Sequence, residues 1–186
     1  MPMSNVQLLI TGGPGSGATT TAEALARRLG VACFDSDDFF HKPSDPPFVE
    51  QYSKDERNQR IIDVLQSHDA WILSGSVCSW ELSDLSFTHA VLLNVGCSVR
   101  MDRLYRRERQ RFGDRINPGG DMYEENTGFM KWAAAYEAGD LAGRSLPMER
   151  GFIDEYCTAL LEIKEQRPVD DLVDLIAEFV KTQTLA

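Results

Sequence analysis

The chain has 186 residues, of which 42% are hydrophobic and 26% are charged, as expected for one soluble domain with a substantial core. Its formal net charge of −10 argues against nucleic acid or an anionic membrane as the main partner. No apolar run approaches the roughly 20 residues of a membrane span, and residues 1–6 lack the pattern of a signal peptide.

The first elements predicted along the chain are a buried strand, a glycine-rich turn and a helix. Residues 8–10 form the apolar run of the strand. The helix is indicated by apolar residues at helical spacing, namely Ala22, Leu25, Ala26 and Leu29, and Gly30 is a suitable stop. This order of elements is the context that gives weight to a phosphate-binding motif.

The turn fits most of the P-loop pattern, which is Gly, any four residues, Gly, Lys, and Ser or Thr. Gly12 and Gly17 fit the glycines and Thr19 fits the hydroxyl position, but Ala18 stands where the lysine belongs. Glycine amides and the start of the helix can still hold a phosphate, and the threonine can reach magnesium, whereas the lysine's point charge is missing. The predicted nucleotide cradle comprises Gly12, Gly13, Pro14, Gly15, Ser16, Gly17, Ala18, Thr19 and Thr20. The alternative is a glycine-rich turn without a ligand.

This loop resembles that of the P-loop kinase superfamily of small-metabolite and nucleotide kinases. Some cytidylate-kinase-like members of that superfamily also lack the lysine and read Gly-Ser-Gly-Thr-Thr-Thr, which is similar to residues 15–20. The resemblance implies that Ala18 does not by itself make the loop inactive. The loop therefore either works by a variant mechanism or retains binding alone.

Four further apolar runs follow, at residues 31–34, 70–73, 89–95 and 158–163. One helical pattern lies between the runs, at residues 54–67, and another follows the last run, after Pro168. The alternation predicts an α/β fold with a five-stranded, mainly parallel sheet sandwiched by helices, in a single domain over residues 1–186. Ligands collect at the carboxyl ends of such strands, so the P-loop should share one rim with residues 35–38 and 74–76.

Asp35 and Asp37 follow the second strand at alternate positions, so both carboxylates can face one site. Shikimate and gluconate kinases have an Asp-x-Asp at this place that serves magnesium and the acceptor hydroxyl. The resemblance implies that Asp35 holds magnesium, directly or through water, and that Asp37 orients an acceptor hydroxyl. The alternative is structural, because Ser36, Asp37 or Asp38 can cap a short helix.

Seven arginines fall within the sixteen residues 100–115, in a chain that is acidic overall. Four of them share one helical face beside an apolar stripe of Met101, Leu104, Tyr105 and Phe112, and this arginine face comprises Arg100, Arg103, Arg107 and Arg111. Forked arginine donors in such numbers indicate an anionic ligand. The alternative is a solvated helix whose arginines pair with Asp102, Glu108 and Asp114.

Adenylate-kinase-like proteins carry an Arg-x-x-x-Arg on the corresponding helix, where a mobile lid over ATP begins. Arg103 and Arg107 match that spacing, and Arg111 and Arg115 would then lie in the lid, at about residues 108–122. Residues 117–121 break the helix and are expected to hinge this lid. The aromatic residues Phe129, Trp132 and Tyr136 follow at helical spacing and are interpreted as core.

Other candidate ligand contacts lie at the ends of strands and in turns. Gly75 and Ser76 end the third strand, where related kinases place small residues beside the acceptor. Arg144 is interpreted either as a second positive charge for the phosphates and the substrate or as a surface ion pair, and Arg167 either as a contact to the base or as part of a helix start. An acceptor-side insertion is expected at about residues 38–60, where Pro43, Pro46 and Pro47 indicate irregular structure.

The order of motifs over nearly the whole chain resembles a bacterial branch of adenylate-kinase-like and shikimate-kinase-like P-loop kinases. The resemblance implies a magnesium- and ATP-dependent kinase that phosphorylates a small metabolite or nucleotide, with Asp37, Arg107 and Arg111 as catalytic residues. The alternative is a nucleotide-binding protein or weak NTPase without transfer, because Ala18 replaces the lysine. Widely spaced Cys33, Cys78, Cys97 and Cys157 indicate reduced thiols in a cytoplasmic protein, either a monomer or a homodimer.

Overall fold

A five-stranded sheet forms the centre of the computed structural model, which describes residues 5–45 and 48–184. All strands run parallel, in the order β2-β3-β1-β4-β5. The strands are β1 (Gln7–Gly12), β2 (Ala32–Asp35), β3 (Trp71–Ser74), β4 (Phe87–Leu93) and β5 (Cys157–Ile163). The predicted α/β architecture is therefore confirmed, with the P-loop strand in the middle of the sheet. The predictions for Pro46 and Pro47 lie outside the described residues.

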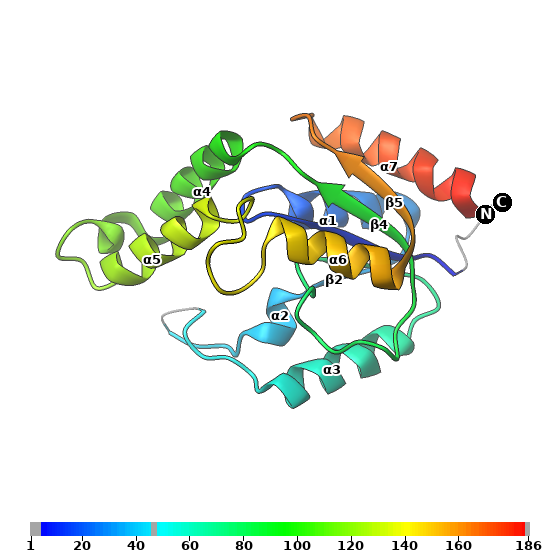
Figure 1. Ribbon diagram of the computed structural model, residues 1–186, viewed down its shortest axis with the longest axis horizontal. Helices are drawn as coiled ribbons and strands as arrows, with labels where there is room; N and C mark the ends of the chain where they lie inside the picture. The colour runs from blue at the N-terminus through cyan, green and yellow to red at the C-terminus, as the bar shows by residue number, and fades with distance from the viewer. Residues whose placement is uncertain (1–4, 46–47, 185–186) are drawn as a thin grey trace.

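Helices cover both faces of this sheet, which explains the nearly continuous apolar strands. Leu8 and Ile10 of β1 pack with α1 (Ala18–Leu29) and α7 (Val169–Thr184) in one core cluster. Leu9 belongs to a second cluster on the other face, which includes residues of α3 (Lys54–Gln66) and α6 (Leu146–Tyr156). In Figure 1, α6 lies in front of the sheet and α1 behind it.

Predicted helix ends are confirmed where their capping chemistry is strong. Gly30 ends α1 in the left-handed conformation, and its N–H donates to the carbonyl of Ala26. Ser53 and Glu56 form a capping box at the start of α3. The short α2 (Asp37–Phe40) begins directly after Ser36, so this part of the structural interpretation of the acidic cluster holds, although the Ser36 side chain does not cap it.

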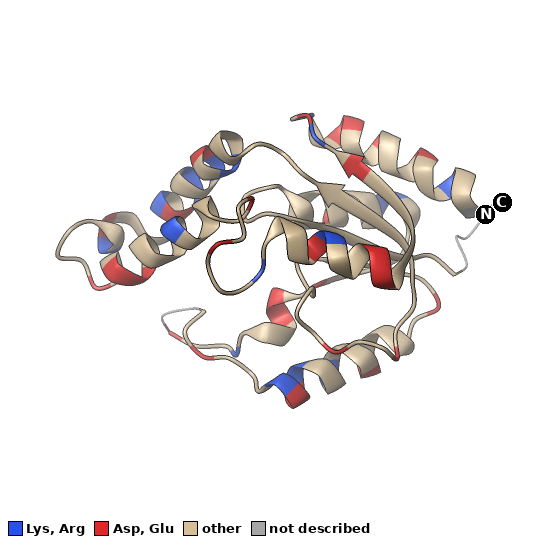
Figure 2. Ribbon diagram, viewed as in Figure 1, with Lys and Arg blue, Asp and Glu red and all other residues tan. Residues whose placement is uncertain are grey.

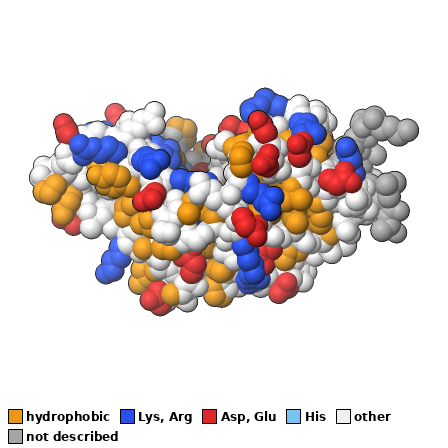
Figure 3. All heavy atoms as spheres, turned by 90° about the horizontal axis from the view of Figure 1, so that it is seen from above, with side chains coloured by type: hydrophobic (Ala, Val, Ile, Leu, Met, Phe, Trp, Pro, Cys, Tyr) orange, Lys and Arg blue, Asp and Glu red, His pale blue; other side chains and the backbone are white. Residues whose placement is uncertain are grey.

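A helical arm projects from the body of the protein (Figure 1). It consists of α4 (Cys97–Phe112), the short 3-10 helix η1 (Gly113–Ile116) and α5 (Tyr123–Ala134). Figure 2 shows several basic segments along α4, and the space-filling view in Figure 3 shows Lys and Arg side chains over the same part of the molecule. None of the described helices is long and apolar enough to cross a membrane.

The apolar stripe predicted for α4 needs correction. Leu104 and Phe112 are buried, but 61% of Tyr105 is exposed, whereas Arg100 is 1% exposed. Arg100 takes an interior position because Glu137 and backbone carbonyls satisfy its guanidinium. Helical spacing alone does not reveal such partners.

Candidate active site

The P-loop joins the end of β1 to the start of α1 through backbone conformations that favour glycine. Gly15 and Gly17 have φ values of 83° and 98°, in the left-handed region. A Cβ atom at Gly15 would lie 2.5 Å from the carbonyl oxygen of Arg100, so a side chain is also excluded there by space. No side chain caps α1, whose first backbone amides are therefore suited to an anion.

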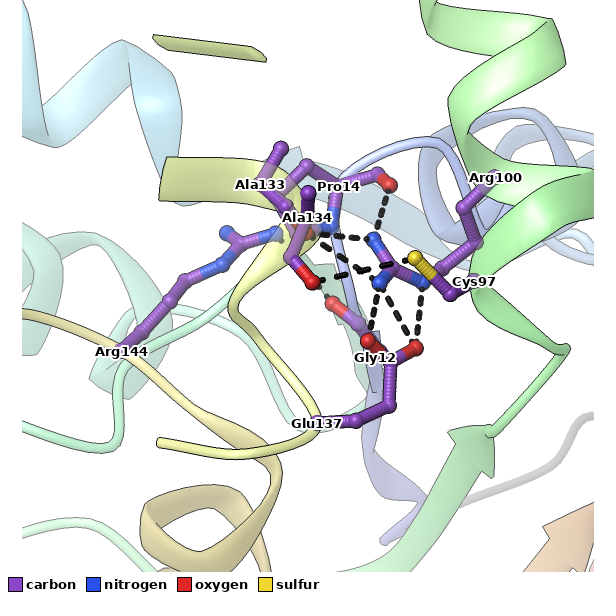
Figure 4. A network of polar contacts seen from close by, with 8 residues as sticks. All are labelled: Gly12, Pro14, Cys97, Arg100, Ala133, Ala134, Glu137 and Arg144. Carbon is purple, nitrogen blue, oxygen red and sulfur yellow. Dashed lines mark hydrogen bonds and ion pairs between the residues drawn. The ribbon is translucent and has the colours of Figure 1, made fainter. Parts of the chain in front are cut away.

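Three arginines bind carbonyl oxygens of this loop. Arg100 donates to the carbonyl of Pro14 at 2.9 Å, Arg103 to that of Ser16 at 2.8 Å, and Arg144 to that of Gly12 at 3.2 Å. Arg100 and Arg144 approach the loop from opposite sides (Figure 4).

These carbonyl contacts also orient the amides of the loop. In a trans peptide the N–H points opposite to the C=O of the same peptide unit. The N–H groups of Gly15 and Gly17 consequently point away from Arg100 and Arg103, which bind the preceding carbonyls. Arg100 and Arg103 thus hold these two donors facing away from α4, where a phosphate can accept from them.

Arg100 acts as the most deeply buried part of this clamp. Its guanidinium forms an ion pair with Glu137 at 2.6 Å, donates to the carbonyl of Ala133 and lies 5.1 Å from the centre of the Tyr136 ring. Of the arginine face predicted to bind an anion, this member therefore binds the protein instead.

Asp35 joins the P-loop to the neighbouring strand β3. Its Oδ2 accepts from the Thr19 hydroxyl at 2.8 Å and from the Ser74 hydroxyl at 2.9 Å, and its Oδ1 accepts from the Asp37 amide at 2.9 Å. Hydroxyl and carboxylate oxygens are the ligands that Mg²⁺ prefers. Thr19 and Asp35 therefore fit magnesium, most of whose ligands would be water and phosphate, since no group of three or more His, Cys, Asp or Glu among the described residues could hold a metal.

Asp37 is exposed to solvent, although protein atoms lie densely around its carboxylate. Burial raises the pKa of Asp37, and the charge of Asp35 raises it further. Arg144, His41 and Arg107 oppose this rise, so three basic side chains from different segments surround this carboxylate. The P-loop rim thus brings together the predicted residues Asp37, Arg107 and Arg144.

The end of β3 beside the acidic cluster is built around Gly75, which has a φ of 98°. A Cβ atom there would lie 2.1 Å from the Ser36 hydroxyl oxygen, and the Ser76 amide donates to the same oxygen at 3.1 Å. Gly75 and Ser76 therefore lie beside the acidic cluster, as the topology of the sheet predicts.

The outer arginines of the arm bind protein groups. Arg107 and Arg111 both pair with the buried Glu108, at 2.9 and 3.8 Å. The Arg111 guanidinium also lies 4.8 Å from the ring centre of Phe48, and Arg115 pairs with Asp121 at 2.7 Å, at the outer end of the arm. Arg115 is not brought to the P-loop in this structure, and its predicted contact with nucleotide depends on movement of the arm.

A pocket of about 270 Å³ lies between the start of α1 and the loop before α7. Arg103 and Arg167 contribute its charged side chains, while the rest of the lining consists of Ser16, Gly17, Thr20, Thr21, Val169 and Leu172. An apolar wall with two flat guanidinium groups suits a nucleotide base.

Sequence reasoning missed Glu149, which is fully buried in α6 and accepts from the Thr11 hydroxyl at 2.9 Å. Sequence reasoning places Arg144 in a turn and predicts no helix after it. The available signals were a proline in the first turn of α6 and the spacing of Phe152, Ile153 and Tyr156.

Comparisons with known proteins agree with this architecture. The AAA domain family AAA_18 matches residues 8–126. The uncharacterized protein YqaC of Bacillus subtilis (strain 168) is 29% identical over 174 residues, which are 93% of this chain and 96% of that protein.

Two solved structures also share the fold. Shikimate kinase from Acinetobacter baumannii, in complex with shikimate, has a TM-score of 0.57 at 17% identity and covers 98% of this chain and 97% of its own. Deoxyadenosine kinase from M. mycoides, with bound dATP, has a TM-score of 0.61 at 14% identity, and the match covers 95% of this chain and 100% of that chain. The fold is thus that of the P-loop kinases.

Proposed function

Because the chain belongs to the AAA_18 family of AAA domains and has a P-loop kinase fold, we propose that it is an ATP-dependent kinase of a small metabolite or nucleotide. The observation that carries the proposal is the position of Asp37. This carboxylate lies at the rim of the P-loop among the charges of Arg107 and Arg144. A phosphoryl transfer needs such a carboxylate beside positive charge more than it needs one particular cation.

The loop and its neighbours divide the binding of ATP between them. The amides of Gly15 and Gly17 bind the phosphates, and the pocket beside Arg103 and Arg167 takes the base. Thr19 and Asp35 hold Mg²⁺, which neutralises charge on the phosphates when it is bound. These contacts fix the nucleotide before the acceptor arrives.

The chemistry falls to Asp37 and to the arm. Asp37 orients the acceptor hydroxyl for in-line attack and accepts its proton, while Gly75 and Ser76 leave room for the acceptor. The outer part of the arm, at about residues 108–122, acts as a lid. When this lid closes, Arg107 and Arg111 bring positive charge to the transferring phosphoryl group. The segment at about residues 38–60 contributes to the choice of acceptor.

A second candidate function is nucleotide binding or weak NTP hydrolysis without transfer. Ala18 is the observation that favours it, because the lysine charge is absent from the loop. The two functions differ in whether any acceptor receives phosphate.

An acceptor panel with γ-labelled ATP and magnesium separates these functions. We expect labelled product with at least one member of a panel of sugars, hydroxy acids, nucleosides and nucleoside monophosphates, and little release of free phosphate without an acceptor. ATP hydrolysis that no acceptor changes would support the NTPase instead. Nucleotide binding with neither transfer nor hydrolysis would support a binding protein.

A further inference from the structure

Arg144 is delivered to the P-loop by a loop that docks on one tryptophan. The Trp132 indole N–H donates to the carbonyl of Ala142 at 3.1 Å. Gly143 has a φ of 105°, and a Cβ atom there would lie 3.0 Å from the same indole nitrogen. The Arg144 guanidinium lies 5.8 Å from the centre of the Trp132 ring and donates to the carbonyl of Gly12. The loop therefore presents this arginine in a defined place.

Glu149 lies behind the same point of the P-loop. It is 0% exposed, and its Oε2 accepts from the hydroxyl of Thr11, the residue before Gly12. Burial raises the pKa of Glu149, whereas the Arg144 charge and the hydroxyls of Ser76 and Thr11 favour its ionised form. The acid and the arginine therefore attract each other across the first residue of the loop.

Buried polar atoms around Arg144 and Glu149 have no hydrogen-bond partner among the described residues. Arg144 Nε is buried without a hydrogen-bond partner, and the same holds for the Tyr136 hydroxyl. Glu149 Oε1 also lacks a well-formed hydrogen bond among the described residues, although Ser76 lies near the carboxylate. Buried donors without partners are costly, and they are common where a ligand supplies the partner.

The neighbours of Arg144 indicate which part of a nucleotide would supply the missing hydrogen-bond partner. Arg144 lies close enough to Asp37 to oppose the rise in its pKa, and Asp37 is at the acceptor end of the site. Arg103, by contrast, lines the proposed base pocket together with Arg167. The terminal phosphate must lie between the base and the acceptor, and so on the side of Arg144.

We propose that Arg144 supplies to the bound terminal phosphate the positive charge that a P-loop lysine would supply, and that Glu149 is the positioning residue that holds it there. This inference rests on the proposed function, because it presumes that the loop binds a nucleoside triphosphate. Arg144 acts in the bound ground state, whereas Arg107 and Arg111 are assigned to the transfer step on the closing arm. The difference makes the role of Arg144 measurable without an acceptor.

The test is calorimetry of magnesium AMP-PNP, a non-hydrolysable ATP analogue, and of magnesium ADP. We expect Arg144→Ala to weaken AMP-PNP binding about tenfold or more and ADP binding about twofold or less, because a lost charged hydrogen bond affects the terminal phosphate alone. Arg150→Ala is the matched control, since Arg150 lies on α6 and pairs with Glu162 at 2.6 Å. It should leave both affinities unchanged.

Glu149→Gln separates positioning from folding. Glutamine can still accept from Thr11 and has nearly the same shape, so the thermal midpoint should change little. The preference for AMP-PNP over ADP should nevertheless decrease several-fold. Adding Ala18→Lys to either variant should restore that preference, which a purely structural defect would not allow.

The outcomes distinguish this inference from the proposed function. Wild-type protein that binds AMP-PNP, with the same AMP-PNP-to-ADP preference in Arg144→Ala, would overturn the role of Arg144 and leave the kinase proposal intact. An unchanged preference in Glu149→Gln, with the expected loss in Arg144→Ala, would remove the positioning role of Glu149. Wild-type protein that binds neither nucleotide would overturn both proposals.

Discussion

Asp37 is the residue on which the proposed transfer depends, and its surroundings suit a base. Burial and the neighbouring Asp35 raise its pKa, so it binds a proton more readily than an ordinary aspartate does. Arg144 and Arg107 oppose this rise. A raised pKa makes a carboxylate a better proton acceptor.

Replacing Asp37 with asparagine should separate transfer from binding. We expect transfer to the best acceptor to fall about 100-fold, because the proton acceptor is lost, while affinity for magnesium ATP stays within a few-fold. In the wild type, the ionised form of Asp37 is active, so kcat/KM should rise as the pH passes the raised pKa of Asp37. This rise should occur at a higher pH than the pKa of an ordinary aspartate. Steady-state kinetics over pH measure both effects. Full activity in the variant would exclude Asp37 as the base.

At the scale of elements, the P-loop depends on α4. The helix supplies Arg100 and Arg103 to loop carbonyls, and the Arg100 carbonyl lies directly against Gly15. The arm is therefore connected to the nucleotide site through the base of α4. Movement of the lid would occur beyond this clamp, in the more exposed outer half of the arm.

Gly15→Ala tests this close approach. The substitution would place a Cβ atom 2.5 Å from a backbone oxygen in a left-handed conformation, and we expect it to cost about 2 kcal/mol of unfolding free energy or more. The control is Gly128→Ala in α5, where no atom lies within 4 Å of the new Cβ. That change should stabilise the protein by up to about 1 kcal/mol. If denaturant titrations gave the same change in unfolding free energy for the two variants, the proposed clamp would be contradicted.

The sequence predicted the elements whose signals are local. The strand, glycine loop and helix around Gly12 follow from apolar periodicity and glycine alone, and the rim of Asp35 and Gly75 follows from parallel topology. Arg100 was misplaced because helical spacing shows which residues share a face and not which of them finds a partner. Glu149 was missed because an acidic residue in an amphipathic helix normally faces solvent, and only packing beneath Thr11 buries it.

At the scale of the whole molecule, an acidic protein concentrates positive charge where an anion would bind. Against a formal net charge of −10, arginines gather on α4 and around the P-loop, as Figure 2 shows for the arm. Such a local field suits the proposed nucleotide, whereas the net charge of the chain disfavours nucleic acid. Every proposed role depends on this site holding a triphosphate without the usual lysine.

Calorimetric titration of the folded wild-type protein with magnesium ATP and magnesium GTP tests that dependence most directly. The amides of the P-loop and the charge of Arg144 predict saturable binding of at least one of these nucleotides. We expect one site per chain and a dissociation constant below about 1 mM. Absence of binding heat up to millimolar concentrations, confirmed by unchanged thermal midpoints in the presence of either nucleotide, would contradict the account.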